Sequence, residues 1–560
     1  MIRRVLAVEG VRDALVLGLL ALVLFSLGVD WGLPAGTGPS AATTWAPDEL
    51  APVGSFGELY NALIVRTEPY GPQYPLFHYF VASAFCAPYL LALLIGGGLA
   101  SPAPVFPFGL ADPATSLPIL TILARIPSLA MAAATVTLAS FTARTLWRDR
   151  GAALVAGGAI LVTVPLTYYA RTSNVDAPAL FWTGAGLAVF AIILRTGLTS
   201  RRAVWLGVFA ALAVATKDAS YATFAAIAPV VVWRGRRSGR TGTRAIMWGL
   251  GAAILVYAFG SGLVLNPARY ADHVRFILGG TELPAGVDSP FYGSVGDSWI
   301  ARLGLARGAV RLLADSLGWP LLALSMLGLG LCLVRDRAAC WLMLPALGLF
   351  VGVILPAGFV QIRFLLPVAY GLALMSGFAV AAARDRGSAR RLALVAAGAA
   401  IMFGGVGGVD LTRQMRNDSR VRAAVWLSRN LTPGDTLGYY GAALKLPRTP
   451  PSTVSRPMAG QLVVEPGTSI VERPPFVIVV PQQDFEPAHE WTLPPERFAA
   501  LLSGASGYRQ MVAIQTPVLL GGRPIPFVNP PVRIFVREDV VPRLPDGDAP
   551  LVELEAPGGS

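Results

Sequence analysis

Long apolar segments separated by short polar loops alternate along the chain from Ala14 to Asp410. A helix needs about 20 apolar residues to cross the ~30 Å hydrocarbon core of a bilayer. Because segments of this kind recur, the pattern predicts a mainly α, polytopic membrane protein with about eleven transmembrane helices. We expect these helices near residues 13–30, 119–146, 151–170, 177–195, 203–217, 219–233, 245–265, 317–334, 338–358, 364–383 and 392–409.

The pattern changes at about Leu411, after which charged residues and prolines are frequent and apolar runs shorten to strand length. We predict two domains: a transmembrane domain over residues 1–410, whose first outer loop covers 30–118, and a soluble α/β domain over 411–560. In the second domain we expect helices at "VRAAVWLSRN" and "PERFAALLSG" and strands at "TLGYYG", "FVIVV" and "VRIFV". We find no catalytic constellation there, interpret His489 as a surface residue, and expect the domain to recognise the acceptor or to cap the membrane domain.

The composition supports the membrane interpretation and excludes two other classes. The chain of 560 residues is 54% hydrophobic and 14% charged, whereas a soluble domain carries about 25% charged residues. The net charge is +12, and the positively charged residues are almost all arginines, many of which lie in short loops. This pattern indicates membrane topology rather than a nucleic-acid partner. The three cysteines lie inside apolar runs without CxxC spacing, so neither a disulfide framework nor a thiolate metal site is implied.

Arginine clusters between the apolar segments predict the orientation of the chain, because cytoplasmic loops are enriched in Lys and Arg. If the N-terminus is cytoplasmic, the expected helices place every cluster inside. The first outer loop and the C-terminal domain then lie outside a plasma (inner) membrane. The clusters are Arg3 and Arg4; Arg148 and Arg150; Arg195, Arg201 and Arg202; Arg234 to Arg244; Arg335 and Arg337; and Arg384, Arg386, Arg390 and Arg391.

Two segments permit more than one interpretation. The first apolar segment is either a cleaved signal peptide or an uncleaved span, and the number of later spans favours the span. The segment from Pro75 to Gly98 is long enough to cross, but a single crossing would move most later clusters outside. We interpret it as an interfacial or re-entrant helix, with a pair of crossings that includes residues 101–118 as the alternative.

Four stretches on the expected outer side carry charged residues that suit one kind of site. "WAPDEL" holds the adjacent carboxylates Asp48 and Glu49, "YYARTSNVDAP" holds Arg171 and Asp176, "ATKDAS" holds Lys217, and "QIRFLLP" holds Arg363. A carboxylate can take the proton of an acceptor hydroxyl as it attacks a sugar, and Lys or Arg can stabilise a leaving phosphate. The chain has no GxxxxGK[ST] loop and no GxGxxG turn between a strand and a helix.

At these residues the sequence resembles the GT-C glycosyltransferases of the protein O-mannosyltransferase type, whose bacterial relatives include the lipid A aminoarabinose transferases. The resemblance covers roughly Met1 to Ala383. It implies an inverting transfer from a polyprenyl-phosphate sugar, with Asp48 as the base, Glu49 beside it and Asp176 as a second active-site acid. It also implies that Lys217, Arg363 and Arg171 bind the donor phosphate. The acceptor is a protein, a glycan or a lipid.

The stretch "YADHVRFIL" is similar to a histidine-containing stretch of the aminoarabinose transferases, which implies His273 near the site with a divalent metal as a candidate cofactor. An ordinary loop histidine is the alternative. Leu50 and Gln73 stand where those transferases have an Arg and a Lys, so their acceptor does not carry over to this chain.

A transporter or flippase of a lipid-linked or small solute is the main alternative from another class, and a structural envelope protein is a weaker one. Carriers usually place ionisable residues near mid-membrane and repeat their halves. We find neither feature in this sequence.

Overall fold

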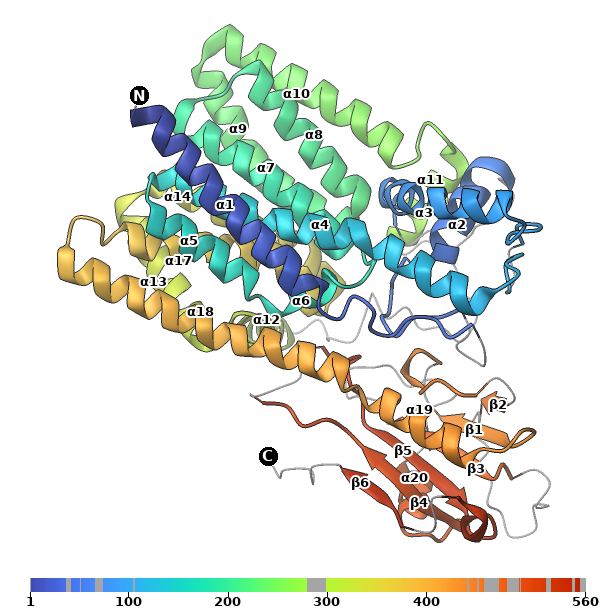
Figure 1. Ribbon diagram of the computed structural model, residues 1–560. Coiled ribbons are helices and arrows are strands. Elements are labelled where there is room, and N and C mark those ends of the chain that lie inside the picture. The colour runs from blue at the N-terminus through green and yellow to red at the C-terminus, as the bar shows by residue number, and fades with distance from the viewer. Residues whose placement is uncertain are drawn as a thin grey trace. The chain divides into compact units, whose positions relative to one another are not determined.

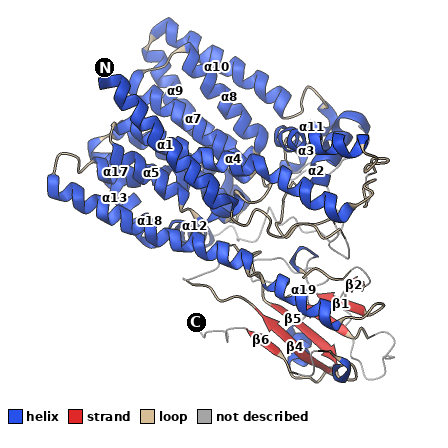
Figure 2. Ribbon diagram, in the orientation of Figure 1, coloured by secondary structure: helices blue, strands red, loops and turns tan. Residues whose placement is uncertain are grey.

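The structure, a computed structural model, is mostly helical, and its strands are confined to the C-terminal part of the chain (Figures 1 and 2). It describes residues 2–36, 42–50, 52–65, 74–103, 106–278, 299–440, 443–450, 453–457, 473–480, 493, 495–519, 525–545 and 549–553. His489 and Gln73 lie outside the described residues.

The chain divides into two compact units. The first contains Met1–Val29, Pro52–Pro88 and Leu123–Val409, and the second contains Asp30–Ala51, Tyr89–Ile122 and Asp410–Ser560. The second unit therefore joins two segments of the expected first outer loop to the C-terminal region.

Helices make up the first unit, and three of them, α3, α4 and α18, continue into the second. The helices up to α10 are α1 (Ile2–Ser26), α2 (Pro52–Tyr60), α3 (Phe77–Ile95), α4 (Pro113–Trp147), α5 (Arg150–Leu161), α6 (Val164–Tyr169), α7 (Asp176–Thr196), α8 (Ser200–Thr216), α9 (Tyr221–Arg237) and α10 (Gly239–Gly260). The later ones are α11 (Pro267–Ile277), α12 (Trp299–Leu317), α13 (Trp319–Arg335), α14 (Arg337–Cys340), α15 (Leu344–Leu349), α16 (Leu355–Ala357), α17 (Leu366–Ala381) and α18 (Gly387–Arg416). Short 3₁₀ and π turns connect several of them: η1 (Asn61–Val65), η2 (Asp218–Ser220), η3 (Trp341–Met343), η4 (Phe350–Ile354) and η5 (Ile362–Leu365).

Helices α7 and α17 are the central ones of this unit. The most apolar windows of their segments are 78% and 83% buried, compared with 17% for α10 and for α18. Small residues let the backbones approach closely, as is common between membrane helices. A Cβ atom on Gly328 of α13 would lie 1.9 Å from the carbonyl oxygen of Met375 in α17, and one on Gly207 of α8 would lie 2.1 Å from that of Gly249 in α10. Accordingly, α8 lies between α7 and α10 (Figure 1).

Helical structure is present at all eleven expected ranges, but one expected helix is broken and another changes its helix type along its length. The range 151–170 is broken into α5 and α6 because Pro165, at the start of α6, has no N–H to donate back to the preceding turn. The range 338–358 is covered by one helical segment, Arg337–Ala357, in which the 3₁₀ turn η3 and the π turn η4 separate α14, α15 and α16.

Among the described residues, seven helical segments are long and apolar enough to cross a membrane, or eight if the pair α12–α13, bent by 112°, forms one span. Helix α3, in the segment that we interpreted as interfacial, is one of the seven. The count of eleven spans and the placement of α3 therefore stay predictions.

The C-terminal region of the second unit forms a six-stranded mixed sheet in the order β2-β1-β3-β5-β4-β6. Its strands are β1 (Thr436–Tyr440), β2 (Val454–Pro457), β3 (Phe476–Val479), β4 (Tyr508–Ile514), β5 (Val532–Arg537) and β6 (Leu551–Glu553). Strand β1 is parallel to β2 and β3, β5 is antiparallel to β3 and β4, and β6 is parallel to β4.

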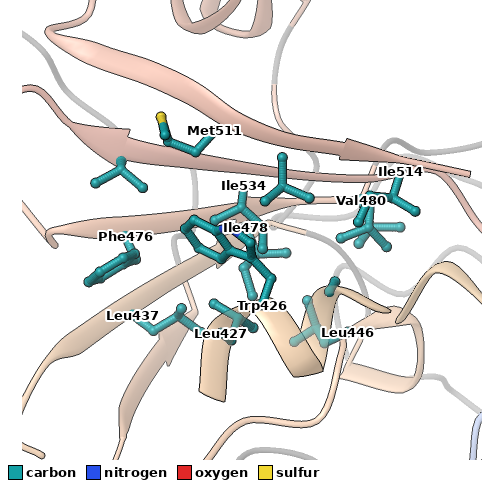
Figure 3. Packing of buried hydrophobic residues seen from close by; sticks show 14 of the residues in the cluster. Trp426, Leu427, Leu437, Leu446, Phe476, Ile478, Val480, Met511, Ile514 and Ile534 are labelled. Atoms are coloured by element: carbon teal, nitrogen blue, oxygen red, sulfur yellow. The ribbon is translucent and has the colours of Figure 1, made fainter. Parts of the chain in front are cut away.

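Both faces of this sheet are covered, which explains why β3 is apolar at every position. Phe476 and Ile478 pack with Trp426 of helix α19 (Ser419–Asn430), as Figure 3 shows. Val477 and Val479 point to the other face and pack with Leu501 of helix α20 (Pro495–Leu502). The helices and strands expected in this region are confirmed, and β2, β4 and β6 were not predicted.

Candidate functional site

The helices of the first unit bring their arginine clusters together at one end. The contacts there are the ion pairs Arg195 with Asp336, Arg390 with Asp149 and Arg150 with Asp13, and a hydrogen bond from Arg335 to the carbonyl of Ala382. Asp13 lies in the middle of α1, and the other residues stand at the ends of α5, α7, α13, α17 and α18 or in the adjoining loops. The clusters that predicted one membrane side thus share one end of the helices.

Asp176, Lys217 and Arg363 lie at the opposite end of the same helices. Helix α7 begins at Asp176 and carries Arg195 in its last turn, and its 21 residues give a length of about 30 Å at 1.5 Å per residue. This length matches the hydrocarbon thickness of a bilayer. Lys217 directly follows the last residue of α8, and Arg363 lies in the turn before α17.

Asp176 and Lys217 form a buried ion pair. The Nζ atom of Lys217 lies 2.5 Å from Oδ1 of Asp176, and the two side chains are 12% and 1% exposed. Asp176 is in the first turn of α7, where the helix dipole favours a carboxylate. Its other oxygen, Oδ2, has no hydrogen-bond partner among the described residues. One face of the carboxylate therefore remains available within the site.

Arg363 and Phe364 complete a pocket around this pair. The guanidinium carbon of Arg363 lies 5.7 Å from the centroid of the Phe364 ring, and Nζ of Lys217 lies 5.3 Å from it. Two cations and one carboxylate give the pocket one net positive charge. Its lining consists of Asp176, Ala179, Leu180, Thr183, Lys217, Ala219, Ser220, Leu349, Arg363, Phe364, Leu366 and Pro367.

A second polar group adjoins the pocket through Asp218, the residue after Lys217. Its Oδ1 lies 3.2 Å from Nε2 of His273, which is buried on α11. One turn earlier on α11, Arg269 pairs with Glu58 of α2 at 2.7 Å. Glu58, Asp218 and Arg269 were not predicted as site residues, although Asp218 stands next to Lys217.

Burial of Glu58 raises the pKa of its carboxyl group to about 7, against the opposing charge and hydrogen bond of Arg269. Glu58 therefore exchanges a proton near neutral pH inside a buried pair.

The metal-binding role predicted for His273 stays a prediction. Among the described residues, no group of three or more His, Cys, Asp or Glu side chains is placed to hold a metal ion. His273 and Asp218 supply two donors, fewer than the three protein ligands of a typical catalytic zinc site.

Arg171 is buried and does not belong to the lining of the pocket. Its guanidinium donates to the carbonyls of Leu24 and Phe25, near the end of α1, at 3.1 and 3.2 Å. This contact satisfies two carbonyls at a helix end. It gives no support to the phosphate-binding role predicted for Arg171.

Asp48 and Glu49 belong to the second unit. Asp48 is exposed and has φ +56°, and Glu49 is half-buried. The left-handed conformation is one that Asp and Asn tolerate better than other non-glycine residues. The structure thus brings three predicted site residues, Asp176, Lys217 and Arg363, into one pocket and places the predicted carboxylate pair in the other unit.

Long apolar helices with a charged pocket opposite their arginine-rich end define the class of the chain: a multi-pass membrane protein. No protein-family model matches the sequence, and no curated protein matches it.

Among solved structures, the chain is similar to ArnT from Cupriavidus metallidurans in the apo state, with 16% identity, 94% of this chain and 98% of that chain covered, and a TM-score of 0.48. It is also similar to the same protein bound to undecaprenyl phosphate, with 15% identity, 93% of this chain and 97% of that chain covered, and a TM-score of 0.48. The chain is also similar to the S. cerevisiae protein O-mannosyltransferase Pmt1-Pmt2 complex bound to the sugar donor, with 17% identity over 50% of this chain and 35% of that one, and a TM-score of 0.28. At these identities and TM-scores, the similarities assign neither a substrate nor a role to any residue.

Proposed function

We propose that the protein is an inverting glycosyltransferase that moves a sugar from a polyprenyl-phosphate donor to an acceptor on the outer face of the membrane. The observation that carries this proposal is the pocket in which Lys217 and Arg363 flank Phe364 beside Asp176, at the end of the helices opposite the arginine clusters. The family resemblance of the sequence supports the same reaction.

The pocket suits the phosphate of a lipid-linked sugar. Arg and Lys form strong, charge-assisted hydrogen bonds with phosphate oxygens. When the bond between the anomeric carbon and the phosphate oxygen breaks, the phosphodiester becomes a monoester and gains one negative charge. Lys217 and Arg363 therefore interact more strongly with the leaving group than with the bound donor, which lowers the barrier. In this arrangement Asp176 holds Lys217 in place.

Asp48 serves as the general base in this proposal. The acceptor oxygen attacks the anomeric carbon from the side opposite the phosphate, Asp48 takes the acceptor's proton, and polyprenyl phosphate leaves with the bonding electron pair. A positioned base of this kind contributes typically 10²- to 10⁴-fold to the rate. Glu49, half-buried beside it, holds the loop. The transferred sugar is a hexose or a pentose.

Binding of a polyprenyl-phosphate sugar to the purified protein tests the pocket directly. We expect Arg363→Ala to weaken binding by roughly tenfold or more, because a hydrogen bond to a charged group contributes about 1.5–3 kcal/mol. Arg195→Ala is the matched control, since it removes an arginine at the other end of α7. Equal affinity for both variants would remove Arg363 from the site, and binding without turnover would favour a carrier.

A further inference from the structure

The segment that carries Asp48 is held by arginines of the C-terminal region. Residues 42–50, here the Asp48 loop, belong to the same compact unit as α19 and the sheet. Two arginines, the buried Arg420 of α19 and the half-buried Arg448, contact this loop or the preceding residues 30–36. The contacts between these arginines and residues 30–50 all lie within the second unit.

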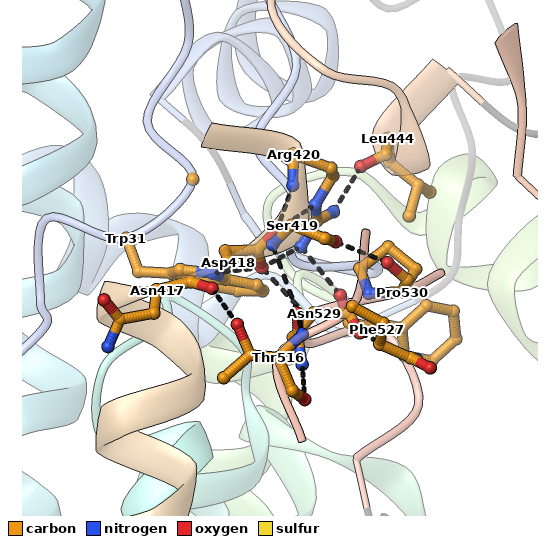
Figure 4. Close-up of polar contacts among 12 residues, drawn as sticks. Trp31, Asn417, Asp418, Ser419, Arg420, Leu444, Thr516, Phe527, Asn529 and Pro530 are labelled. Carbon is orange, nitrogen blue, oxygen red and sulfur yellow. Dashed lines mark hydrogen bonds and ion pairs between the residues drawn. The ribbon is translucent and has the colours of Figure 1, made fainter. Parts of the chain in front are cut away.

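Arg420 is completely buried and fixed on every side. It forms a two-pronged ion pair with Asp418, with distances of 2.9 and 2.7 Å. It also donates to the carbonyls of Leu444 and Phe527, both at 2.9 Å (Figure 4). Four hydrogen bonds and a fully buried ion-pair partner, Asp418, therefore hold this guanidinium in place.

The indole ring of Trp45, three residues before Asp48, packs against this guanidinium. The guanidinium carbon of Arg420 lies 4.0 Å from the ring centroid of Trp45, and that of Arg448 lies 5.2 Å from it. Trp31 packs edge-on against Trp45 and donates its indole N–H to Asp418 at 3.0 Å. The indole N–H of Trp45 has no hydrogen-bond partner among the described residues. Trp45 is therefore held through the face of its ring, by cation–π and aromatic contacts.

Arg448 holds the backbone of both segments, residues 30–36 and the Asp48 loop. Its Nη2 donates to the carbonyls of Leu33 at 2.6 Å and Thr43 at 2.9 Å. Gly32, with φ +64°, packs closely against Trp45, because a Cβ atom on Gly32 would lie 2.6 Å from the Cβ atom of Trp45. Burial, followed by the neighbouring charge of Arg420, lowers the pKa of Arg448.

The backbone between Trp45 and Asp48 has little conformational freedom. The intervening residues are Ala46, which is buried, and Pro47, whose ring fixes φ. Asp48 itself holds a left-handed backbone conformation at φ +56°, which Asp tolerates better than most L-residues. The packing of Trp45 therefore constrains the backbone that carries Asp48.

We propose that Trp45, held between Arg420 and Arg448, is a positioning residue through which the C-terminal domain orients Asp48 for proton transfer. This inference rests on the proposed function, in which Asp48 is the base. It gives the C-terminal domain a part in the chemical step.

The test compares Trp45→Leu with Trp45→Phe in the purified full-length protein. Phe keeps an aromatic face and loses no hydrogen bond, whereas Leu fills space without cation–π attraction. We expect Trp45→Leu to lower kcat by roughly 10- to 100-fold, as small misplacements of a catalytic group do, with KM for the lipid-linked sugar nearly unchanged. Hydrogen exchange at the amides of residues 43–50 should become faster in the same variant. Trp45→Phe should resemble the wild type in both measurements.

Two further variants keep the test decisive. Arg448→Gln should reproduce the effect of Trp45→Leu, and it replaces that variant if Trp45→Leu does not fold. Arg422→Gln is the control, because it removes an exposed ion pair with Glu553 on the same domain without touching the Asp48 loop. Normal kcat or unchanged exchange in both Trp45→Leu and Arg448→Gln overturns the inference. If Asp48→Asn keeps its activity, the proposed function fails instead, and the exchange measurement still reports whether the loop is held.

Discussion

At the scale of single residues, the pocket shows what the sequence could and could not predict. Asp176, Lys217 and Arg363 were predicted because a charged residue at the end of an apolar segment stands out in the sequence. Phe364 and Asp218 were missed although each is adjacent to one of them, because an aromatic or acidic loop residue is common in any sequence. Arg171 was assigned to phosphate because its charge is visible in the sequence, whereas its hydrogen bonds to α1 are not.

The carboxyl group of Glu58 leads to a prediction about pH. Its pKa rises from 4.5 to about 7 on folding, so the folded protein retains a proton that the unfolded chain releases. The contribution of Glu58 to stability should therefore be complete below about pH 4.5 and be lost as the pH rises to about 7, by on the order of 3 kcal/mol.

Thermal unfolding of the wild type and of Glu58→Gln between pH 4.5 and 8 measures this effect. The carboxamide does not titrate, so the wild type should lose stability relative to the variant across this range. A constant difference between the two proteins would show that Glu58 does not titrate there.

At the scale of helices and strands, apolar length and the arginine clusters predicted where the helices lie. They could not predict the break before Pro165 or the short edge strand β6, because a single proline or a three-residue strand barely alters an apolar pattern. Helix α11 was not predicted because it is too short to span a membrane and its buried residues are the polar Arg269 and His273.

The contact between α13 and α17 gives a prediction at this scale. Gly328→Ala should destabilise the protein by about 1–3 kcal/mol, because the added methyl group would meet the backbone of α17. Gly330→Ala on the same helix should be neutral or stabilising, since a Cβ there meets no atom within 4 Å and alanine is the better helix former. Thermal unfolding of both variants in one detergent provides the comparison, and equal stability would contradict the close packing.

At the scale of the whole molecule, the alternation of helix ends supports one orientation in the membrane. The arginine clusters share one end, and Asp176, Lys217 and Arg363 share the other. We therefore expect reporter fusions at Arg240 and after Ser560 to lie on opposite sides, with Arg240 in the cytoplasm. Reporters on the same side would contradict both the orientation and the outer-face site.

The measurement that tests the central claim most directly is turnover of a polyprenyl-phosphate sugar by the purified wild type and by Asp48→Asn. Asparagine keeps the shape of the side chain and tolerates the left-handed conformation at φ +56°, but it cannot accept the proton. We predict a fall of about 10²- to 10⁴-fold in turnover with donor binding retained, and a smaller loss for Glu49→Gln. Turnover of Asp48→Asn within a few-fold of the wild type would contradict the account.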